Sequence, residues 1–167
     1  DGPFAIIDIA TAARARQTID EALPLPYLLF NYKIGDTGVT FGADAQVAAF
    51  EGPASALGSG MLQGIRAAFE EVNAAGGVHG RMIKLDTMDD RYEPDISAAH
   101  VKTIVEEDKH IGLIGAVGTP TSSATQPIAT EANMPFIGPF TGAGFLRDAS
   151  HGNIFNVRAT YFAETEA

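Results

Sequence analysis

The sequence predicts an α/β fold: a doubly wound parallel sheet in three layers, Rossmann-like or flavodoxin-like. Strand candidates and helix candidates alternate along the whole chain, which is typical of βαβ architecture. The strand candidates are apolar throughout, as expected for strands that are covered on both faces. The chain has 167 residues, which is enough for one domain with its own core.

The first predicted unit spans residues 1–37. Two apolar strands, at 3–9 and 26–32, flank a helix at 10–23 that the following prolines end. Residues 33–38 are polar and contain glycine, which indicates a linker or turn. We expect this unit to pack on the same sheet as the rest, residues 38–167, because its apolar strands cannot stay solvated.

Two strand–helix pairs follow. A strand at 39–47 precedes a helix at about 58–74, which the left-handed pair Gly76-Gly77 ends. A strand at 82–88 precedes a helix that runs to about Glu107, with Asp95 as the expected N-cap. The expected core stripes of the two helices are Met61, Ile65, Ala68, Phe69 and Val72, and then Ile96, Val101, Ile104 and Val105.

Residues 111–141 form the unit around which the others are arranged. An apolar strand at 111–117 leads into the loop GTPTSS, then a helix at 122–132 and a second strand at 135–140. Residues 142–149 form a short helix or turn, 153–158 another strand, and 160–167 the beginning of a further element. Because ligands of open α/β sheets bind beyond the carboxyl ends of the strands, the GTPTSS loop and the residue 139–141 corner should lie at the ligand site.

Four hydroxyl residues gather at the start of this helix: Thr119, Thr121, Ser122 and Ser123. Free backbone N–H groups, hydroxyl donors and the positive end of the helix dipole suit a carboxylate or a phosphate. One hydroxyl would suffice as an ordinary N-cap, which is the alternative explanation. The four together favour a ligand.

The pair Asp89-Asp90 also closes a strand at this edge. Two acids there could hold a metal or an amino group, but a solvated turn is the favoured interpretation. Tyr92, two residues later, either stacks on a ligand or covers the edge of the sheet.

Composition excludes several classes of function. Eleven basic residues stand against 21 acidic ones, a net charge of -10, which argues against nucleic acid and anionic membranes as partners. No apolar run approaches a membrane span, and no signal-peptide pattern is visible at the N-terminus. Cysteine is absent, which excludes thiolate metal sites, disulfides and a cysteine nucleophile.

The sequence also lacks the patterns of a catalyst. The four histidines have no metal-ligand spacing, and there is no phosphate-binding P-loop, dinucleotide fingerprint or nucleophile elbow. No general acid and base accompany a nucleophile. We therefore predict no enzymatic activity, no catalytic residue, no metal and no cofactor.

Residues 39–167 resemble the first lobe of type I periplasmic solute-binding proteins, in the leucine/isoleucine/valine-binding branch that serves ABC importers. The segments that carry the resemblance are 39–81 with its Gly-Pro loop and NAAGGVHGR turn, 82–94 with its DD strand end, 112–147 and 153–167. They occur in the order and spacing of that family. A full family member is about twice as long, so the resemblance covers one lobe.

The resemblance implies a small carboxylate-bearing solute, an amino acid or an aromatic or organic acid. Its carboxylate would be held by Thr121, Ser122 and Ser123, and by Phe140 and Thr141, while Tyr92 approaches the cleft. The resemblance also implies a periplasmic location and an ABC permease as the partner of the full-length parent. With one lobe only, we expect weak binding, roughly millimolar or weaker.

Two other interpretations stay open at this stage. A flavodoxin-like or receiver-like domain would bind phosphate by the hydroxyl loop or Mg²⁺ by Asp89-Asp90, although residues 111–160 offer no partner lysine. An interaction domain would form a homodimer through the face that a second lobe normally covers.

Overall fold

A five-stranded parallel sheet forms the centre of the molecule. The computed structural model describes residues 42–166, so the predicted unit at 1–37 lies outside the described part. The strands lie in the order β2-β1-β3-β4-β5 and are all parallel, which confirms the predicted α/β class. They are β1 (Gly42–Ala48), β2 (Ile83–Asp89), β3 (His110–Ile114), β4 (Phe136–Ile137) and β5 (Ile154–Phe155).

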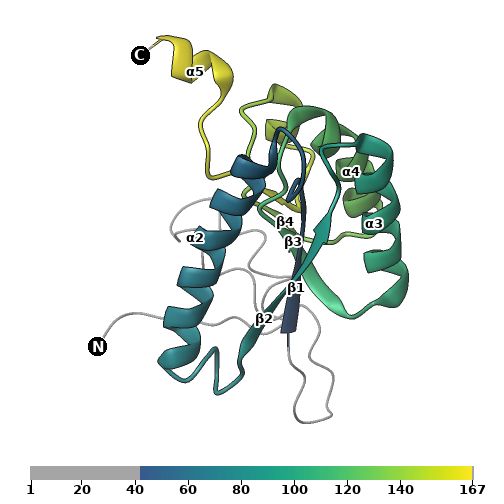
Figure 1. Cartoon of the computed structure of the whole chain (residues 1–167). Coiled ribbons are helices and arrows are strands. Elements are labelled where there is room, and N and C mark those ends of the chain that lie inside the picture. The colour runs from purple at the N-terminus through teal and green to yellow at the C-terminus, as the bar shows by residue number, and fades with distance from the viewer. Residues whose placement is uncertain (1–41, 167) are drawn as a thin grey trace.

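Helices cover both faces of the sheet (Figure 1). Helix α2 (Ser55–Ala74) lies on one face, while α3 (Pro94–Glu107) and α4 (Thr119–Glu131) pack side by side on the other. After β1 the chain first adds β2 on one side and then β3, β4 and β5 on the other side. The winding therefore changes direction between β1 and β3, and a ligand is expected at the carboxyl ends of the strands there.

The last two helical elements lie at this carboxyl edge. The 3-10 helix η3 (Gly144–Arg147) follows β4, and the short helix α5 (Tyr161–Glu166) follows β5. Helix α5 projects from the body of the molecule at the top of Figure 1 and buries none of its residues. No helix within residues 42–166 combines the length and apolar character needed to cross a membrane.

The main core lies between the sheet and the pair α3 and α4. Apolar side chains from both layers interlock there, and each excludes water from its neighbours. Its buried members are Ala45, Val47, Val101, Ile104, Leu113, Ala116, Ala129, Met134, Phe136 and Leu146.

Most of the predicted core stripes are found, with two corrections. Ile65, Val101 and Ile104 are buried, and Met61, Phe69, Val72 and Val105 are half-buried. Ala68 and Ile96, which we expected in the core, are exposed. Ala68 lies about 60° around the helix from Ile65, which places it at the edge of the apolar stripe.

The ends of the helices are defined by backbone chemistry. As predicted, α2 ends in a left-handed pair: Gly77 N–H donates to Val72 O at 2.9 Å and Gly76 N–H to Asn73 O at 3.0 Å. The predicted N-cap of α3 is wrong, because Glu93 caps the helix and Asp95 lies in its first turn. Pro94 takes the first helical position, where its missing N–H costs nothing.

Helix α4 begins earlier than predicted. It starts at Thr119, so residues 119–123 form its first turn rather than a loop. The strands on either side are shorter than predicted, and β4 is confined to two residues between Pro135 and Pro139, which have no N–H to donate to the sheet.

Strand β1 carries two buried polar side chains, Asp44 and Gln46, both fully excluded from solvent. Gln46 Nε2 donates to Gly115 O at 3.1 Å. Neither carboxyl oxygen of Asp44 accepts a hydrogen bond from any residue in the described range. Burial raises the pKa of Asp44 to about 8, so the folded protein favours the neutral acid.

Candidate functional site

Three segments meet at the carboxyl edge of the sheet: the start of α4, the loop after β4, and the segment that follows β5. The loop after β4 is attached to the segment that follows β3, because Phe140 N–H donates to Ala116 O at 2.7 Å. The structure thus brings the start of α4 next to Thr141, as the sequence predicted.

Three hydroxyl groups contact one another at this meeting point. Thr119 Oγ1 lies 2.6 Å from Thr141 Oγ1 and 3.2 Å from the Tyr161 hydroxyl. Thr141 Oγ1 lies 3.0 Å from the same Tyr161 hydroxyl. We call these three residues the hydroxyl cluster. Thr141 also accepts from Ala143 N–H at 3.2 Å. The Thr119 and Thr141 bonds lower the pKa of the Tyr161 phenol, so the cluster favours negative charge at that oxygen.

Tyr161 is held in the cluster by the loop after β4. Its N–H donates to Gly142 O at 3.0 Å, and its ring packs on the bare backbone of Gly142. A Cβ at Gly142 would lie 2.6 Å from Tyr161 Cδ1, so a larger residue would push the ring away.

The guanidinium of Arg147 connects the loop after β4 to the segment after β5. It donates to Ala143 O at 2.8 Å and Thr141 O at 2.9 Å on the loop side. On the other side it donates to Arg158 O at 2.8 Å and Ala159 O at 3.3 Å. One side chain therefore satisfies four carbonyls and fixes the segment that leads to Tyr161.

The predicted residues at the start of α4 differ in accessibility. The Thr121 hydroxyl is buried and donates to the Val117 and Gly118 carbonyls. The ordinary N-cap that we considered as the alternative is not found, because Gly118 occupies the cap position and no side chain of the described residues caps α4. Ser122 is fully buried, and its Oγ has no partner among the described residues. Ser123 is exposed.

Tyr92 also reaches this corner. A Cβ at Gly118 would lie 2.5 Å from Tyr92 Cε2, so the ring lies directly over the glycine that caps α4. Arg91 and Tyr92 both have left-handed backbones, with φ of 52° and 67°. Asp90 supports this turn, because its Oδ1 accepts from Tyr92 N–H at 2.8 Å.

The acid pair that precedes Tyr92 serves the backbone. Asp90 is fully buried, which corrects the expectation of a solvated turn, and its Oδ2 accepts from Ser97 Oγ at 2.7 Å. Burial raises the pKa of Asp90 despite these bonds. Burial also tends to raise the pKa of Asp89. Hydrogen bonds from backbone N–H groups, the largest contribution coming from Phe50, outweigh this effect and bring the pKa of Asp89 below its usual range. Within residues 42–166, no group of three or more His, Cys, Asp and Glu residues could hold a metal.

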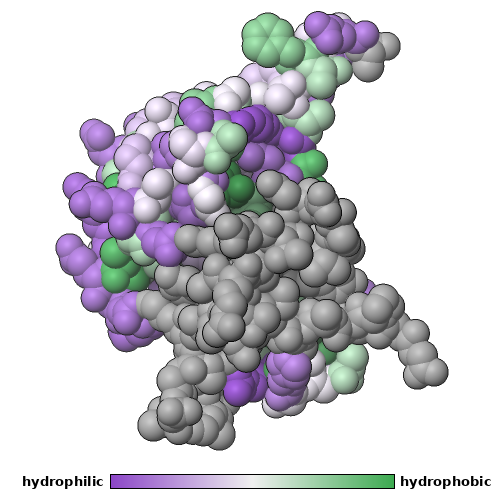
Figure 2. Space-filling model, turned by 180° about the vertical axis from the view of Figure 1, so that it is seen from behind, coloured by the Kyte–Doolittle hydropathy of each residue, from purple (hydrophilic) through white to green (hydrophobic). Residues whose placement is uncertain are grey.

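Aromatic and charged side chains border the hydroxyl cluster. The Arg158 guanidinium lies over two rings, 5.0 Å from the Phe140 centroid and 5.3 Å from that of Tyr161. Glu164 pairs with the same guanidinium through two bonds, of 2.7 and 2.8 Å. Hydrophobic atoms are visible on the projecting segment at the top of Figure 2. In the C-terminal arm, which we define as residues 157–166, Val157 and Phe162 are 73% and 78% exposed.

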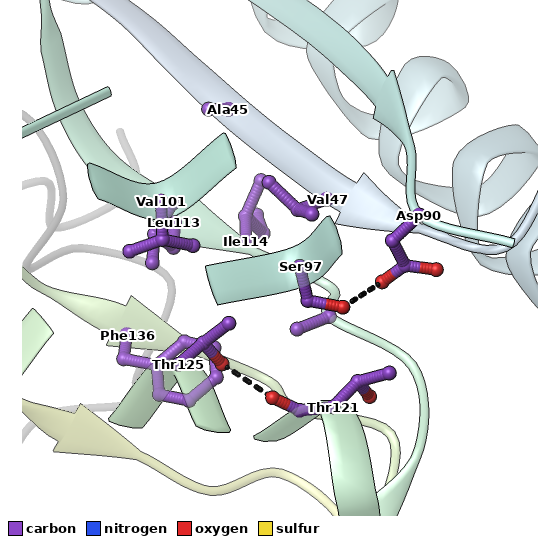
Figure 3. Close-up of a pocket in the computed structure, with 11 residues that line it drawn as sticks. Ala45, Val47, Asp90, Ser97, Val101, Leu113, Ile114, Thr121, Thr125 and Phe136 are labelled. Carbon is purple, nitrogen blue, oxygen red and sulfur yellow. Dashed lines mark hydrogen bonds between the residues drawn. The ribbon is translucent and has the colours of Figure 1, made fainter. Parts of the chain in front are cut away.

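A small interior pocket lies behind this corner, between the sheet and helices α3 and α4 (Figure 3). Its lining is mostly apolar, from Ala45 to Phe136, and two hydrogen bonds border it: Ser97 to Asp90, and Thr125 to the Thr121 carbonyl. These polar groups are already satisfied. The pocket is therefore a gap in core packing, not the ligand site.

The sequence prediction missed two members of the hydroxyl cluster. Thr119 was recognised as a loop hydroxyl but was not included in the site, and Tyr161 was not considered. Only one signal pointed to Tyr161: it follows the last predicted strand, at the same edge as the other ligand-site candidates.

Comparison with known proteins identifies the family. The family model for periplasmic binding proteins matches residues 45–167. The chain belongs to this family. A solved structure of a possible leucine/isoleucine/valine-binding protein from Rhodopirellula baltica SH 1 is 38% identical, with a TM-score of 0.68 over 78% of this chain. The predicted resemblance to the type I, leucine/isoleucine/valine-binding branch is confirmed.

The relatives of this periplasmic binding protein are much longer. The chain covers 36% of the Rhodopirellula protein. An amino acid binding protein from Pseudomonas aeruginosa is 32% identical over 88 residues, which are 53% of this chain and 24% of that protein. A Leu/Ile/Val-binding protein homolog from Brucella melitensis is 26% identical over 117 residues, 69% of this chain and 29% of that protein. The matched region therefore has the extent of a single lobe.

Proposed function

We propose that this periplasmic binding protein lobe binds a small carboxylate-bearing solute, with amino acids as the first candidates. The observation that carries the proposal is the hydroxyl cluster, in which the Thr119 and Thr141 hydroxyls contact one polar oxygen, that of Tyr161, at the carboxyl edge where α/β sheets bind ligands. The unpaired, buried Ser122 hydroxyl and the start of α4 add donors at the same corner. The Pseudomonas and Brucella relatives, by their names, bind amino acids.

The proposed binding surface consists of the start of α4, the loop after β4, and the Tyr92 ring. The predicted residues are Thr121, Ser122, Ser123, Phe140, Thr141 and Tyr92, to which we add Thr119, while the Tyr161 side chain covers this surface. The exposed Ser123 and the half-buried Tyr92 are open to solvent, and Phe140 is 37% exposed. A solute could therefore approach from this edge, and it would reach the buried Thr141 hydroxyl only after the group that covers it has moved.

The proposed role is transport rather than catalysis. As part of a longer parent, the lobe would work in the periplasm and deliver its solute to an ABC permease. The remaining two thirds of such a parent would supply the contacts to the amino group and side chain of the ligand. The lobe alone is expected to bind with a Kd of roughly millimolar or weaker, because half of the contacts are missing.

NMR titration of ¹⁵N-labelled protein tests the proposal. L-leucine should shift the amide signals of residues 119–123 and 140–142 with millimolar affinity, whereas L-leucinamide, which lacks the carboxylate, should not. Unchanged signals at this corner with both L-leucine and benzoate would refute carboxylate binding there. A micromolar Kd for the lobe by calorimetry would contradict the single-lobe interpretation.

A second role is favoured by the apolar side chains of the C-terminal arm. Val157 and Phe162 are apolar and largely exposed, and two copies of the chain could cover them by forming a homodimer. Light scattering coupled to size exclusion would detect a dimer, and a Phe162→Ser variant should then be monomeric.

A further inference from the structure

We propose that Tyr161 competes with the ligand: its hydroxyl occupies the position that a carboxylate oxygen takes, and the ligand must displace it. This inference rests on the proposed function and adds a form of regulation to the same site. Tyr161 would thus act as a plug that covers Thr141 in the unliganded lobe.

The first argument is the number of hydrogen bonds that Thr141 can make. A hydroxyl donates one bond and accepts two. Thr141 Oγ1 already has three partners, namely Ala143 N–H, Thr119 Oγ1 and the Tyr161 hydroxyl. Thr141 is also completely excluded from solvent. A ligand oxygen can therefore bond to Thr141 only after one of these three groups has left.

Tyr161 is the partner that can leave. Ala143 N–H belongs to the loop backbone, and Thr119 is the first residue of the 13-residue helix α4, which packs on the core. Tyr161 belongs to the six-residue helix α5, which buries no residue, and its own side chain is 43% exposed. Displacing its side chain breaks the two threonine bonds and the ring contacts with Gly142 and Arg158, but it takes no buried residue out of the core.

The Tyr161 oxygen resembles a ligand oxygen in its surroundings. It lies between two threonine hydroxyls, at 3.0 and 3.2 Å, as a carboxylate oxygen would. A charged acceptor forms shorter and stronger bonds to such donors than a neutral phenol does. A carboxylate can therefore replace the phenol, and the lowered pKa of Tyr161 agrees with a site that favours negative charge.

Arg147 limits how far this displacement can extend. It holds the carbonyls of Arg158 and Ala159 against the loop after β4, so the chain is fixed up to residue 159. The Tyr161 N–H bond to Gly142 O and the Arg158–Glu164 ion pair hold the backbone of residue 161 and helix α5 as well. The displacement is therefore a rotation of the Tyr161 side chain about its χ1 angle, with α5 kept in place.

The test combines affinity with a direct signal from the tyrosine. L-leucine is titrated against the wild type, Tyr161→Phe, which keeps the ring but removes the hydroxyl, and Tyr161→Ala, which opens the corner. We expect both variants to bind L-leucine more tightly, about threefold to tenfold, because less competition remains. In wild-type protein labelled with 3-fluorotyrosine, L-leucine should shift the Tyr161 ¹⁹F signal toward its solvent-exposed value.

Phe162→Ala is the matched control, because this neighbouring aromatic residue of α5 is 78% exposed and should not change the affinity. Weaker binding by Tyr161→Phe would show that the hydroxyl contacts the ligand, and would overturn the plug. Unchanged affinity in both Tyr161 variants would also overturn it, while amide shifts at residues 119–123 would leave the proposed function intact. If neither the wild type nor Tyr161→Ala binds L-leucine or benzoate, both proposals fall.

Discussion

Replacing Asp44 with asparagine should remove a large pH dependence from the stability of the lobe. The carboxyl group is buried in β1 with no hydrogen bond from the described residues, and burial raises its pKa to about 8. In the unfolded chain the same group is solvated and has the ordinary aspartate pKa of 3.8. Between these two values the folded state binds a proton that the unfolded state has lost.

The sign and size of the effect follow from proton linkage. Because the folded state binds more protons, the free energy of unfolding falls as the pH rises from 3.8 to about 8, by about 1.4 kcal/mol per pH unit. At pH 7 Asp44 alone has therefore lowered the free energy of unfolding of the wild type by about 4 kcal/mol relative to its value below pH 4. Asparagine has a similar shape but no titrating group, so this loss is absent.

Urea denaturation followed by far-UV circular dichroism, at pH values from 4 to 9, measures this difference. The two proteins should be similar at pH 4, and Asp44→Asn should become progressively more stable than wild type up to pH 8. Glu70→Gln, an exposed substitution on α2, serves as the control and should follow the wild-type curve. Parallel curves for wild type and Asp44→Asn between pH 5 and 8 would refute the buried neutral acid.

Three further substitutions test the contacts of Asp90, Tyr92 and Arg147 around the proposed site. Ser97→Ala removes the bond to the buried Asp90 and should lower the free energy of unfolding by about 1–3 kcal/mol, as measured by urea denaturation. Gly118→Ala forces a Cβ against Tyr92 at a φ of 105° and should cost more than about 1 kcal/mol, whereas Gly60→Ala on α2, where the space is open, should not. Arg147→Lys leaves carbonyls of the loop after β4 and of the segment after β5 without donors, so the α5 amides should exchange hydrogen faster. Unchanged exchange rates would contradict the idea that Arg147 holds these two segments together.

The order of the elements was predictable because it depends on local patterns. Apolar runs and helical stripes identified each strand and helix from 42 to 158, and the Gly76-Gly77 stop needs only its neighbours. The parallel sheet then brought the start of α4 next to Thr141 by topology alone. Tyr92 was correctly placed near this corner for the same reason.

What the sequence could not show depends on contacts between distant residues. Tyr161 bonds to Thr119 across 42 positions, and neither residue has a local pattern that indicates this pairing. Asp44 was overlooked because the strand candidates were taken to be apolar throughout. Strand β1 lies between β2 and β3 with helices over both faces of the sheet, so residues 44–48 are all buried whichever face they point to.

The left-handed turn at Arg91-Tyr92 has a consequence for how this lobe could be engineered. Glycine adopts a φ of 67° without the steric cost that tyrosine carries, so Tyr92→Gly would relieve the backbone at this position. The same change would strip the ring from Gly118 and from the mouth of the proposed site. The lost ring packing opposes the relief of the backbone, so Tyr92→Gly should change thermostability little while it weakens ligand binding. A screen for stability alone would therefore not protect a side chain that we propose contacts the ligand.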